Sequence, residues 1–514
     1  MASLLTRARV QHLLIVLVGT AVAIVVTRDV PYILNRSFWL DESWVALTVR
    51  YPLADLPHLT SSTPIGWNAT QRLFEPLGEQ AQRLLPLIFA WLASAVAYVL
   101  GYFAWDATRR IRILTGIFVS AVVICSPFML ARTDLKQYTA DVFFALLVAT
   151  LAVLAERRRS RAALYTLTIV SSLGMFFSLT VVFVAASAFL ALLGAAIIRR
   201  DKRLILERAV AGAISAASIL LVYFSLYRQA SVGALADYWA DYYPSLSALP
   251  TYLVSRSLAL TGVSSVPLQV LILVTVAALI ISFVVLAFRE REFVMGIYLI
   301  ALVLAVLAAG VARVYPLLNV RTSSFFLVSM CVFAALALAR LGVLASYRFV
   351  GEKRRGIALV AAFALLIAGA VAFSARDFRS NVISLEDPRS QIDYIKTHWS
   401  KNDIIATDDA GAFSLAYYWP ELGGRWVASD KFANGFHMTF ARSSGVVVAG
   451  KGDDLPSLLE SAITSRHATT VWFLSTHHLQ APYVSSTNVV DEFGARRIST
   501  GTEPLYAVRA ATLG

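Results

Sequence analysis

The sequence is poor in charged residues and in cysteine. Only 15% of its 514 residues are Asp, Glu, Lys or Arg, whereas 58% are hydrophobic and the mean hydropathy is +0.68. This composition excludes an ordinary soluble protein of this length and indicates a polytopic membrane protein. The two cysteines, Cys125 and Cys331, lie in or beside apolar segments, which argues against a disulfide framework.

Motifs of several common enzyme classes are also missing. The chain has no phosphate-binding Walker loop, no Gly-x-Gly-x-x-Gly, no Gly-x-Ser-x-Gly and no Cys-x-x-Cys, and its histidines lack metal-ligand spacing. We therefore predict no cofactor and no metal site, although a divalent cation is compatible with the sequence. The net charge of +13 does not indicate nucleic acid, because the basic residues form short clusters between apolar segments.

The apolar segments predict about eleven membrane spans. Most are near the ~20 residues that a crossing helix needs, and basic clusters at alternate ends place the N-terminus in the cytoplasm. The start at Thr6–Arg9 is expected to act as a retained signal anchor. The expected spans are 11–33, 84–105, 111–130, 139–155, two within 162–198 that turn near Phe177–Leu179, 207–227, 266–287, 293–311, 323–340 and 356–374.

The last part of the chain has a different character. Residues 376–514 are polar, with β-rich runs at 403–407, 445–449 and 470–474 and helical candidates at 388–398 and 455–465. Strands that alternate with helices predict a small α/β domain. We thus expect a mainly α membrane bundle over residues 1–375 and an α/β domain over 376–514. An odd number of spans places this second domain outside the cytoplasm.

One stretch stands out in the first outer loop, Ser37-Phe-Trp-Leu-Asp41-Glu42-Ser-Trp44. Two adjacent carboxylates follow the first span and are flanked by aromatic residues, which favour the membrane interface. A partly desolvated carboxylate there can serve as a general base. The alternative is that Asp41 and Glu42 simply occupy the start of a short interfacial helix over 42–50.

Other polar residues gather in the outer loops, whereas the cytoplasmic loops are short and basic. The acids there are Asp134, Asp237 and Asp241, and the cations include Arg132, Lys136, Arg313 and Arg321. Carboxylates suit proton abstraction from a hydroxyl, and Arg or Lys suits a phosphate. Alternatively, Lys136 and Arg132 are snorkelling residues, and Asp237 and Asp241 are solvated loop charges. The combination of acid and cation at an interface fits a lipid-phosphate substrate.

These elements together resemble the polytopic GT-C glycosyltransferases, near the protein O-mannosyltransferases and the aminoarabinose transferase of lipid A. The resemblance rests on Asp41-Glu42, the Pro64-Ile-Gly-Trp67 turn, Glu79-Gln-Ala-Gln-Arg83-Leu-Leu-Pro86, Asp134-Leu-Lys136-Gln-Tyr138, and Tyr315-Pro316 with Arg321. It covers residues 1 to about 375 in layout but only these short elements in sequence. The resemblance depends on the order of these elements in the chain and on their common location in the outer loops.

The resemblance implies an inverting transferase that uses a sugar linked to polyprenyl phosphate and an acceptor glycan, lipid or protein. Asp41 matches the catalytic base, or the acid that orients the acceptor, and Glu42 matches its supporting carboxylate. Asp134, Lys136, Tyr138, Arg132, Tyr315 and Arg321 form the implied substrate-binding set. Lys136 stands where many members have Arg, and Phe177–Leu179 lacks the His that members often carry there.

The expected setting is a bacterial plasma membrane. Two other function classes remain open: a polar-lipid transporter or flippase, and a non-catalytic protein of cell-envelope assembly. The near absence of charge within the spans argues against the transporter.

Overall fold

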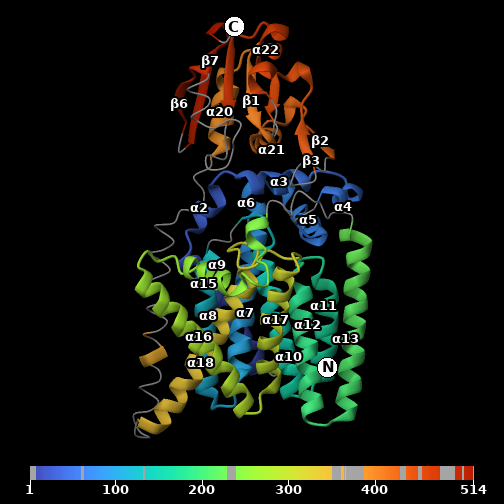
Figure 1. Cartoon of the computed structure of the whole chain (residues 1–514), viewed down its shortest axis with the longest axis vertical. Helices are drawn as coiled ribbons and strands as arrows, with labels where there is room; N and C mark the ends of the chain where they lie inside the picture. Colours follow the sequence, from blue (N-terminus) through green and yellow to red (C-terminus); the bar gives the residue numbers. More distant parts are fainter. Residues whose placement is uncertain are drawn as a thin grey trace.

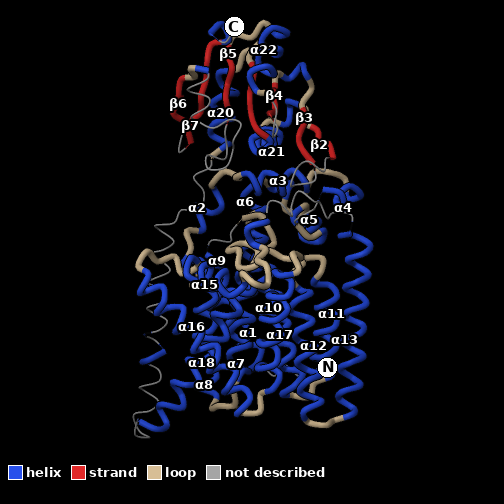
Figure 2. Tube along the Cα trace, in the orientation of Figure 1, coloured by secondary structure: helices blue, strands red, loops and turns tan. Residues whose placement is uncertain are grey.

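The computed structural model describes residues 7–59, 63–130, 134–228, 239–349, 361–363, 365, 387–428, 436–449, 454–474, 493–500 and 503–512. Long helices form a bundle, and a small α/β unit stacks on one end of it (Figure 1). A layer of short helices lies between the two. Figure 2 shows that the strands are confined to the α/β unit.

The bundle consists of long helices that run between its two ends. They are α1 (Arg7–Thr27), α7 (Leu84–Ala104), α8 (Arg109–Ile124), α10 (Tyr138–Arg157), α11 (Arg161–Gly174), α12 (Val181–Ile198), α13 (Lys202–Val222), α16 (Val266–Arg289), α17 (Phe293–Val311) and α18 (Ser324–Phe349). Among the described residues, eight segments are long and apolar enough to cross a membrane. The chain is therefore a multi-pass membrane protein.

The predicted number of eleven spans stays a prediction. Helices α8 and α11 occupy two expected spans but have only 16 and 14 residues. The expected span at 356–374 lies almost wholly outside the described residues, apart from 361–363 and 365, where the Phe363 ring contacts that of Phe118. The expected hairpin within 162–198 is formed by α11 and α12 and turns at residues 175–180.

The first apolar segment is shorter than expected. Helix α1 ends at Thr27, and the carboxylate of Asp29 accepts a hydrogen bond from the Tyr32 amide to start α2 (Val30–Asn35). Asp is a favoured N-cap and Pro31 fits the first turn of a new helix, so the chain turns here although residues 30–33 are apolar.

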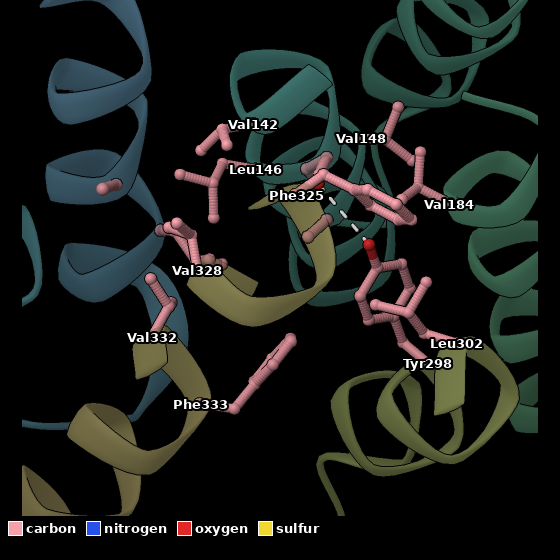
Figure 3. Packing of buried hydrophobic residues seen from close by; sticks show 14 of the residues in the cluster. Val142, Leu146, Val148, Val184, Tyr298, Leu302, Phe325, Val328, Val332 and Phe333 are labelled. Atoms are coloured by element: carbon pink, nitrogen blue, oxygen red, sulfur yellow. Dashed lines mark hydrogen bonds between the residues drawn. The ribbon is translucent and has the colours of Figure 1, made fainter. Parts of the chain in front are cut away.

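Helix α10 lies at the centre of the bundle. Its inward side chains, among them Val142 and Leu146, pack against Phe325 and Val328 of α18 (Figure 3). In the same cluster the Tyr298 hydroxyl of α17 donates a hydrogen bond to the Ala145 carbonyl, at 3.4 Å. Helices with small residues in contact can approach closely, which favours stable packing inside a membrane.

The loops at the bundle end away from the α/β unit carry the basic clusters. Arginines of the helices at this end also pair with acids of the loops, as in Arg157–Asp106 at 3.0 Å and Arg340–Glu290 at 2.8 Å. We call this the basic end and the opposite one the capped end.

The capped end carries the layer of short helices. Besides α2 it contains α3 (Leu40–Thr48), α4 (Leu56–Leu59), α5 (Ile65–Gln71) and α6 (Glu79–Gln82), with one-turn helices at Leu53–Asp55 and Glu75–Leu77. Helices α9 (Pro127–Leu130) and α15 (Leu249–Ala259), a π-helical turn at Tyr223–Tyr227 and a 3₁₀ turn at Ala240–Tyr242 lie in the loops below. The stretch with the paired acids is thus helical.

The α/β unit has a five-stranded sheet of order β4-β1-β5-β7-β6. Its strands are β1 (Ile404–Asp408), β4 (Val446–Ala449), β5 (Thr470–Leu474), β6 (Arg496–Thr500) and β7 (Glu503–Arg509). The first three are parallel, with Ile405 beside both Val446 and Trp472, and β7 and β6 are antiparallel. A separate hairpin pairs β2 (Arg425–Ala428) with β3 (Phe436–Thr439).

The helices of this unit are α20 (Pro388–His398), α21 (Asp409–Tyr418) and α22 (Leu455–Arg466), with 3₁₀ turns at Pro420–Leu422, Arg442–Ser444 and Ala510–Thr512. The α/β character, the three predicted strands and both predicted helices are confirmed. Asp408 caps α21 by accepting a hydrogen bond from the Gly411 amide, at 2.8 Å, as expected for an acid that follows a strand.

Candidate active site

Helix α3 presents its two acids in opposite ways. Asp41 and Glu42 lie in its first turn, and adjacent residues of a helix do not share a face. The Glu42 side chain is fully buried and forms ion pairs with Arg36 at 2.8 Å and Arg83 at 2.9 Å. Its second oxygen also accepts from the Trp39 amide, at 3.4 Å. Glu42 therefore faces the protein interior.

Arg83 fixes the segment that leads into α3. Its guanidinium is buried, lies 4.4 Å from the Phe38 ring centre, and donates to the carbonyls of Arg36 and Ser37 as well as to Glu42. One planar donor group thus holds three consecutive residues and the first helical turn. The Glu42–Arg83 pair thus positions the segment that leads into α3. This gives a structural role to the arginine of the Glu79–Pro86 motif.

Asp41 instead lies against two cations from distant parts of the chain. Its carboxylate is 3.3 Å from Lys136 Nζ and forms an ion pair with Arg321. Lys136 precedes α10 and Arg321 precedes α18, so three loops at the capped end meet at this carboxylate. The Asp41 side chain is 14% exposed and that of Arg321 23%. The cluster therefore borders accessible space.

Aromatic rings line the two cations. Lys136 Nζ lies 4.7 Å from the Trp44 ring centre, and Arg321 lies 4.8 Å from Trp39 and 5.8 Å from Tyr138. Each ring attracts a cation through its negative face, and together they reduce contact with water. The aromatic residues around Asp41 thus serve to hold its partners.

The Pro64–Trp67 turn positions Lys136. The Trp67 indole donates to the Leu135 carbonyl at 2.7 Å, and the Trp67 amide donates to the Phe176 carbonyl at 2.9 Å. At Gly66 an added Cβ would lie 2.6 Å from that Phe176 carbonyl oxygen, so only glycine allows this approach. The turn joins the loop before α10 to the turn between α11 and α12.

The loop before α18 is held by its own polar groups. The Asn319 side chain accepts from the amides of Arg321 at 2.9 Å and Thr322 at 3.1 Å. The Tyr315 hydroxyl donates to the Thr322 carbonyl, and its ring packs 5.2 Å from that of Phe183. Burial raises the pKa of Tyr315 well above its usual range, so it remains a donor. Tyr315 therefore shapes the Arg321 loop.

Of the two cations beside Asp41, Lys136 is the one whose charge depends on pH near neutrality. Burial lowers the pKa of Lys136 to about 8, and the nearby charge of buried Asp134 acts in the opposite direction. Arg321 keeps its charge at any accessible pH. Lys136 is therefore partly neutral in mildly alkaline solution, whereas it is charged at neutral pH.

The remaining predicted residues are placed as follows. Tyr138 is buried and offers its ring to Arg321, and Asp134 is buried beside Lys136. Arg132 and Asp237 lie outside the described residues, and Asp241 belongs to the 3₁₀ turn at Ala240–Tyr242.

A buried acid beneath this cluster was missed by the sequence reasoning. Asp141 lies one helical turn below Tyr138 and accepts a hydrogen bond from the Thr180 hydroxyl at 3.3 Å, while Thr180 and Ser178 are 3.0 Å apart. These hydroxyls occupy the turn where a His was expected from the resemblance. The available signal was an ionisable residue inside an apolar span, which usually marks function.

The α/β unit covers the other side of α3. The Tyr418 hydroxyl accepts from the Phe38 amide at 2.7 Å, and the hydroxyls of Ser414 and Ser43 are 3.1 Å apart. Aromatic residues of both parts share one apolar cluster, in which the rings of Phe38 and Tyr417 are 5.2 Å apart. Helix α3 is thus enclosed between the bundle and α21 (Figure 1).

The sequence matches no protein-family model and no curated protein sequence. Its structure is similar to ArnT from Cupriavidus metallidurans bound to undecaprenyl phosphate, with 14% identity, 98% of each chain covered and a TM-score of 0.51. It is also similar to the oligosaccharyltransferase AglB from Archaeoglobus fulgidus in complex with an inhibitory peptide and a dolichol-phosphate. There the identity is 12%, the coverage 91% of this chain and 70% of that one, and the TM-score 0.51.

Both of these proteins belong to the GT-C superfamily. The similarity to ArnT spans the bundle and the α/β unit alike, because nearly the whole of each chain is covered. The layout inferred from the order of loop motifs therefore agrees with the three-dimensional comparison. The chain therefore shares the fold of these two structures.

Proposed function

We propose that the protein transfers a sugar from a polyprenyl-phosphate-linked donor to an acceptor at the outer face of a bacterial plasma membrane. The observation that carries the proposal is the meeting of Asp41 with Lys136 and Arg321 at the capped end. The two similar structures, one bound to undecaprenyl phosphate and the other in complex with a dolichol-phosphate, support the class of donor.

The sidedness of the proposal follows from charge. Arginines cluster in the loops of the basic end, and basic loops stay in the cytoplasm. The capped end, the Asp41 cluster and the α/β unit would then face outward. A donor with its lipid tail in the outer leaflet would present its phosphate at the level of Lys136 and Arg321.

The two cations suit a phosphate leaving group. In the reaction, an acceptor hydroxyl oxygen bonds to the anomeric carbon while the bond from that carbon to the phosphate oxygen breaks, which inverts the anomeric configuration. The negative charge grows on the phosphate, where Lys136 and Arg321 would stabilise it. Two fixed cations are suited to this task because they need no reorganisation as the charge develops.

Asp41 would take the proton of the acceptor hydroxyl. In the structure its carboxylate is the counter-ion of both cations. A phosphate bound to Lys136 and Arg321 would compete with Asp41, and the released carboxylate could accept a hydrogen bond from the acceptor. Donor binding would thus activate the base. Glu42, which is buried between two arginines, would act only by holding α3.

The test is donor turnover by the purified full-length protein. A panel of undecaprenyl-phosphate sugars is incubated with the protein and with cell-envelope glycan, lipid and protein acceptors, and released undecaprenyl phosphate is measured. Asp41→Asn keeps the size of the side chain but removes the basic carboxylate, so we expect a rate loss of roughly 10²–10⁴. Undecaprenyl phosphate should still bind.

Glu75→Gln is the matched control because Glu75 pairs with Arg50 at 3.0 Å on the surface, away from Asp41. It should leave turnover unchanged. Turnover by Asp41→Asn at the wild-type rate would refute Asp41 as the base. Failure of the wild-type protein to bind undecaprenyl phosphate would refute the donor class.

A further inference from the structure

The loop after α1 buries an arginine that the proposed reaction does not use. Arg28 directly follows the last residue of α1 at the capped end, and its side chain is 3% exposed. In the parts of the chain that the structure describes, no group accepts a hydrogen bond from its Nε or from either of its terminal nitrogens. Burial lowers the pKa of Arg28 to about 10, so the guanidinium stays charged at neutral pH.

An unpaired buried charge is costly. Removing an ion from water without a partner costs several kcal/mol, and buried polar groups in proteins are nearly always paired. The other deeply buried arginines of this protein follow that rule, since Arg83 pairs with Glu42 and Arg208 with Glu156. Among the residues that the structure describes, Arg28 therefore differs from them in having no counter-charge.

The described groups next to Arg28 do not supply a counter-charge. Asp29 uses its carboxylate to cap α2. The electrostatic neighbour of Arg28 is Cys125, and Cys125 is the C-cap residue of α8. The negative end of the α8 dipole offsets only part of the charge. The next residue, Ser126, is also buried, and its hydroxyl has no hydrogen-bond partner within the described part of the chain.

The surroundings indicate which kind of anion would complete the site. Arg28 lies at the boundary of a membrane span, and the adjacent outward residues Val22, Val25 and Val26 are 56%, 62% and 75% exposed. These apolar side chains face the acyl chains of the bilayer. A ligand with a phosphate at this level and a lipid tail along α1 would satisfy both the cation and the apolar surface. Arg is well suited because it can bind a phosphate with two parallel hydrogen bonds.

We propose that Arg28 and the Ser126 hydroxyl form a binding site for the phosphate of a membrane lipid, between the outer ends of α1 and α8. The site is separate from the Asp41 cluster in its residues and does not depend on the proposed transfer reaction. The shared chemistry is a lipid phosphate, which either a phospholipid or the polyprenyl phosphate could supply.

The experiment measures lipid adducts of the purified full-length protein by native mass spectrometry, with phosphatidylglycerol, undecaprenyl phosphate and diacylglycerol as probes. Thermal unfolding is followed with the same additions. Arg28→Met keeps the length of the side chain and removes its charge. Arg28→Lys keeps the charge. Arg72→Met is the matched control, because Arg72 is an arginine of the capped end whose guanidinium already donates to the Tyr51 carbonyl, at 2.6 Å.

We expect phosphatidylglycerol to bind and to raise the unfolding temperature of the wild type, Arg28→Lys and Arg72→Met. For Arg28→Met the affinity should fall roughly 10- to 100-fold, as expected when charge-assisted hydrogen bonds are lost. Diacylglycerol, which has no phosphate, should have no effect. If Arg28→Met weakens undecaprenyl phosphate instead of phosphatidylglycerol, the site belongs to the carrier lipid.

Two results would overturn the proposal. One is equal binding of both phosphate lipids by the wild type and Arg28→Met. The other is an Arg28→Met protein that unfolds at a higher temperature than the wild type in phosphatidylglycerol. That result would show that the lipid does not neutralise the Arg28 guanidinium. Loss of transfer activity in Asp41→Asn would leave these lipid measurements unchanged, so the two proposals fail separately.

Discussion

Replacing Glu42 by Gln tests the assignment of the two adjacent acids to different tasks. The Glu42 carboxylate is fully buried between Arg36, whose side chain is 6% exposed, and Arg83, which is 0% exposed. A neutral amide would leave two buried guanidinium groups without a counter-charge. Removing one partner of a buried ion pair usually costs about 3–5 kcal/mol. That is a large part of the roughly 5–15 kcal/mol by which proteins are stable.

Part of this loss should be recovered. Arg83 keeps its hydrogen bonds to the Arg36 and Ser37 carbonyls, and the Gln oxygen can still accept one donor. We therefore expect a destabilisation at the lower end of that range, about 3 kcal/mol. The measurement is thermal unfolding or resistance to proteolysis of the purified protein in detergent, with the half-life at a fixed temperature as the readout because membrane proteins often unfold irreversibly.

Glu75→Gln is the control. It removes the same charge from a pair with Arg50 whose side chains are 34% and 27% exposed, and exposed pairs contribute less than about 1 kcal/mol. Equal stability of the two variants would refute the structural role of Glu42. A Glu42→Gln protein that is fully stable but inactive would instead return Glu42 to the catalytic group.

Three further predictions concern the Asp41 cluster and the topology. Binding of undecaprenyl phosphate should weaken as the pH rises through about 8, where Lys136 loses its charge, and Lys136→Arg should remove this dependence; binding that is constant from pH 7 to 9 in the wild type would contradict it. Gly66→Ala should destabilise the protein by about 1–3 kcal/mol and weaken lipid binding, since its methyl group meets the Phe176 carbonyl, and a normal unfolding temperature would argue against this contact. A cysteine at exposed Ser457 should react with an impermeant maleimide in intact cells, and reaction only after permeabilisation would invert the proposed sidedness.

Local patterns were sufficient to predict much of the fold. The strands at 404–408, 446–449 and 470–474 are rich in β-branched and apolar residues, and the sheet places them side by side and parallel. Strand β7 was missed because it pairs with β5, which is a long-range contact, and β6 was missed because it joins the sheet only through β7. The end of α1 was misplaced because hydropathy does not register a cap at Asp29. In each case a long-range contact or a single capping side chain determined the structure, and the average hydropathy of the segment did not.

The candidate site likewise contains residues that the sequence could identify and residues whose roles depend on packing. Asp41, Lys136 and Arg321 could be named from the sequence because each lies next to the end of an apolar segment, and the ends of the spans gather at one membrane surface. The task of Glu42 could not be assigned, since its partners Arg36 and Arg83 are fixed only by packing. The helical alternative for residues 42–50 was correct in kind, although α3 begins two residues earlier, at Leu40. Asp141 was overlooked because its partner Thr180 lies in the turn between α11 and α12, far from it in the chain.

The enclosure of α3 has a consequence for biosynthesis. Phe38 and its hydrogen-bond partner Tyr418 are 380 residues apart, so the ribosome must add that length after α3 has emerged. At about 5–20 residues per second this takes roughly 20–80 s, during which α3 has no cover from α21. A nascent or truncated chain can insert its spans but cannot complete the packing around Asp41. Catalytic competence would thus be conferred only on finished chains, and the uncovered apolar side of α3 would expose unfinished ones to chaperones and proteases.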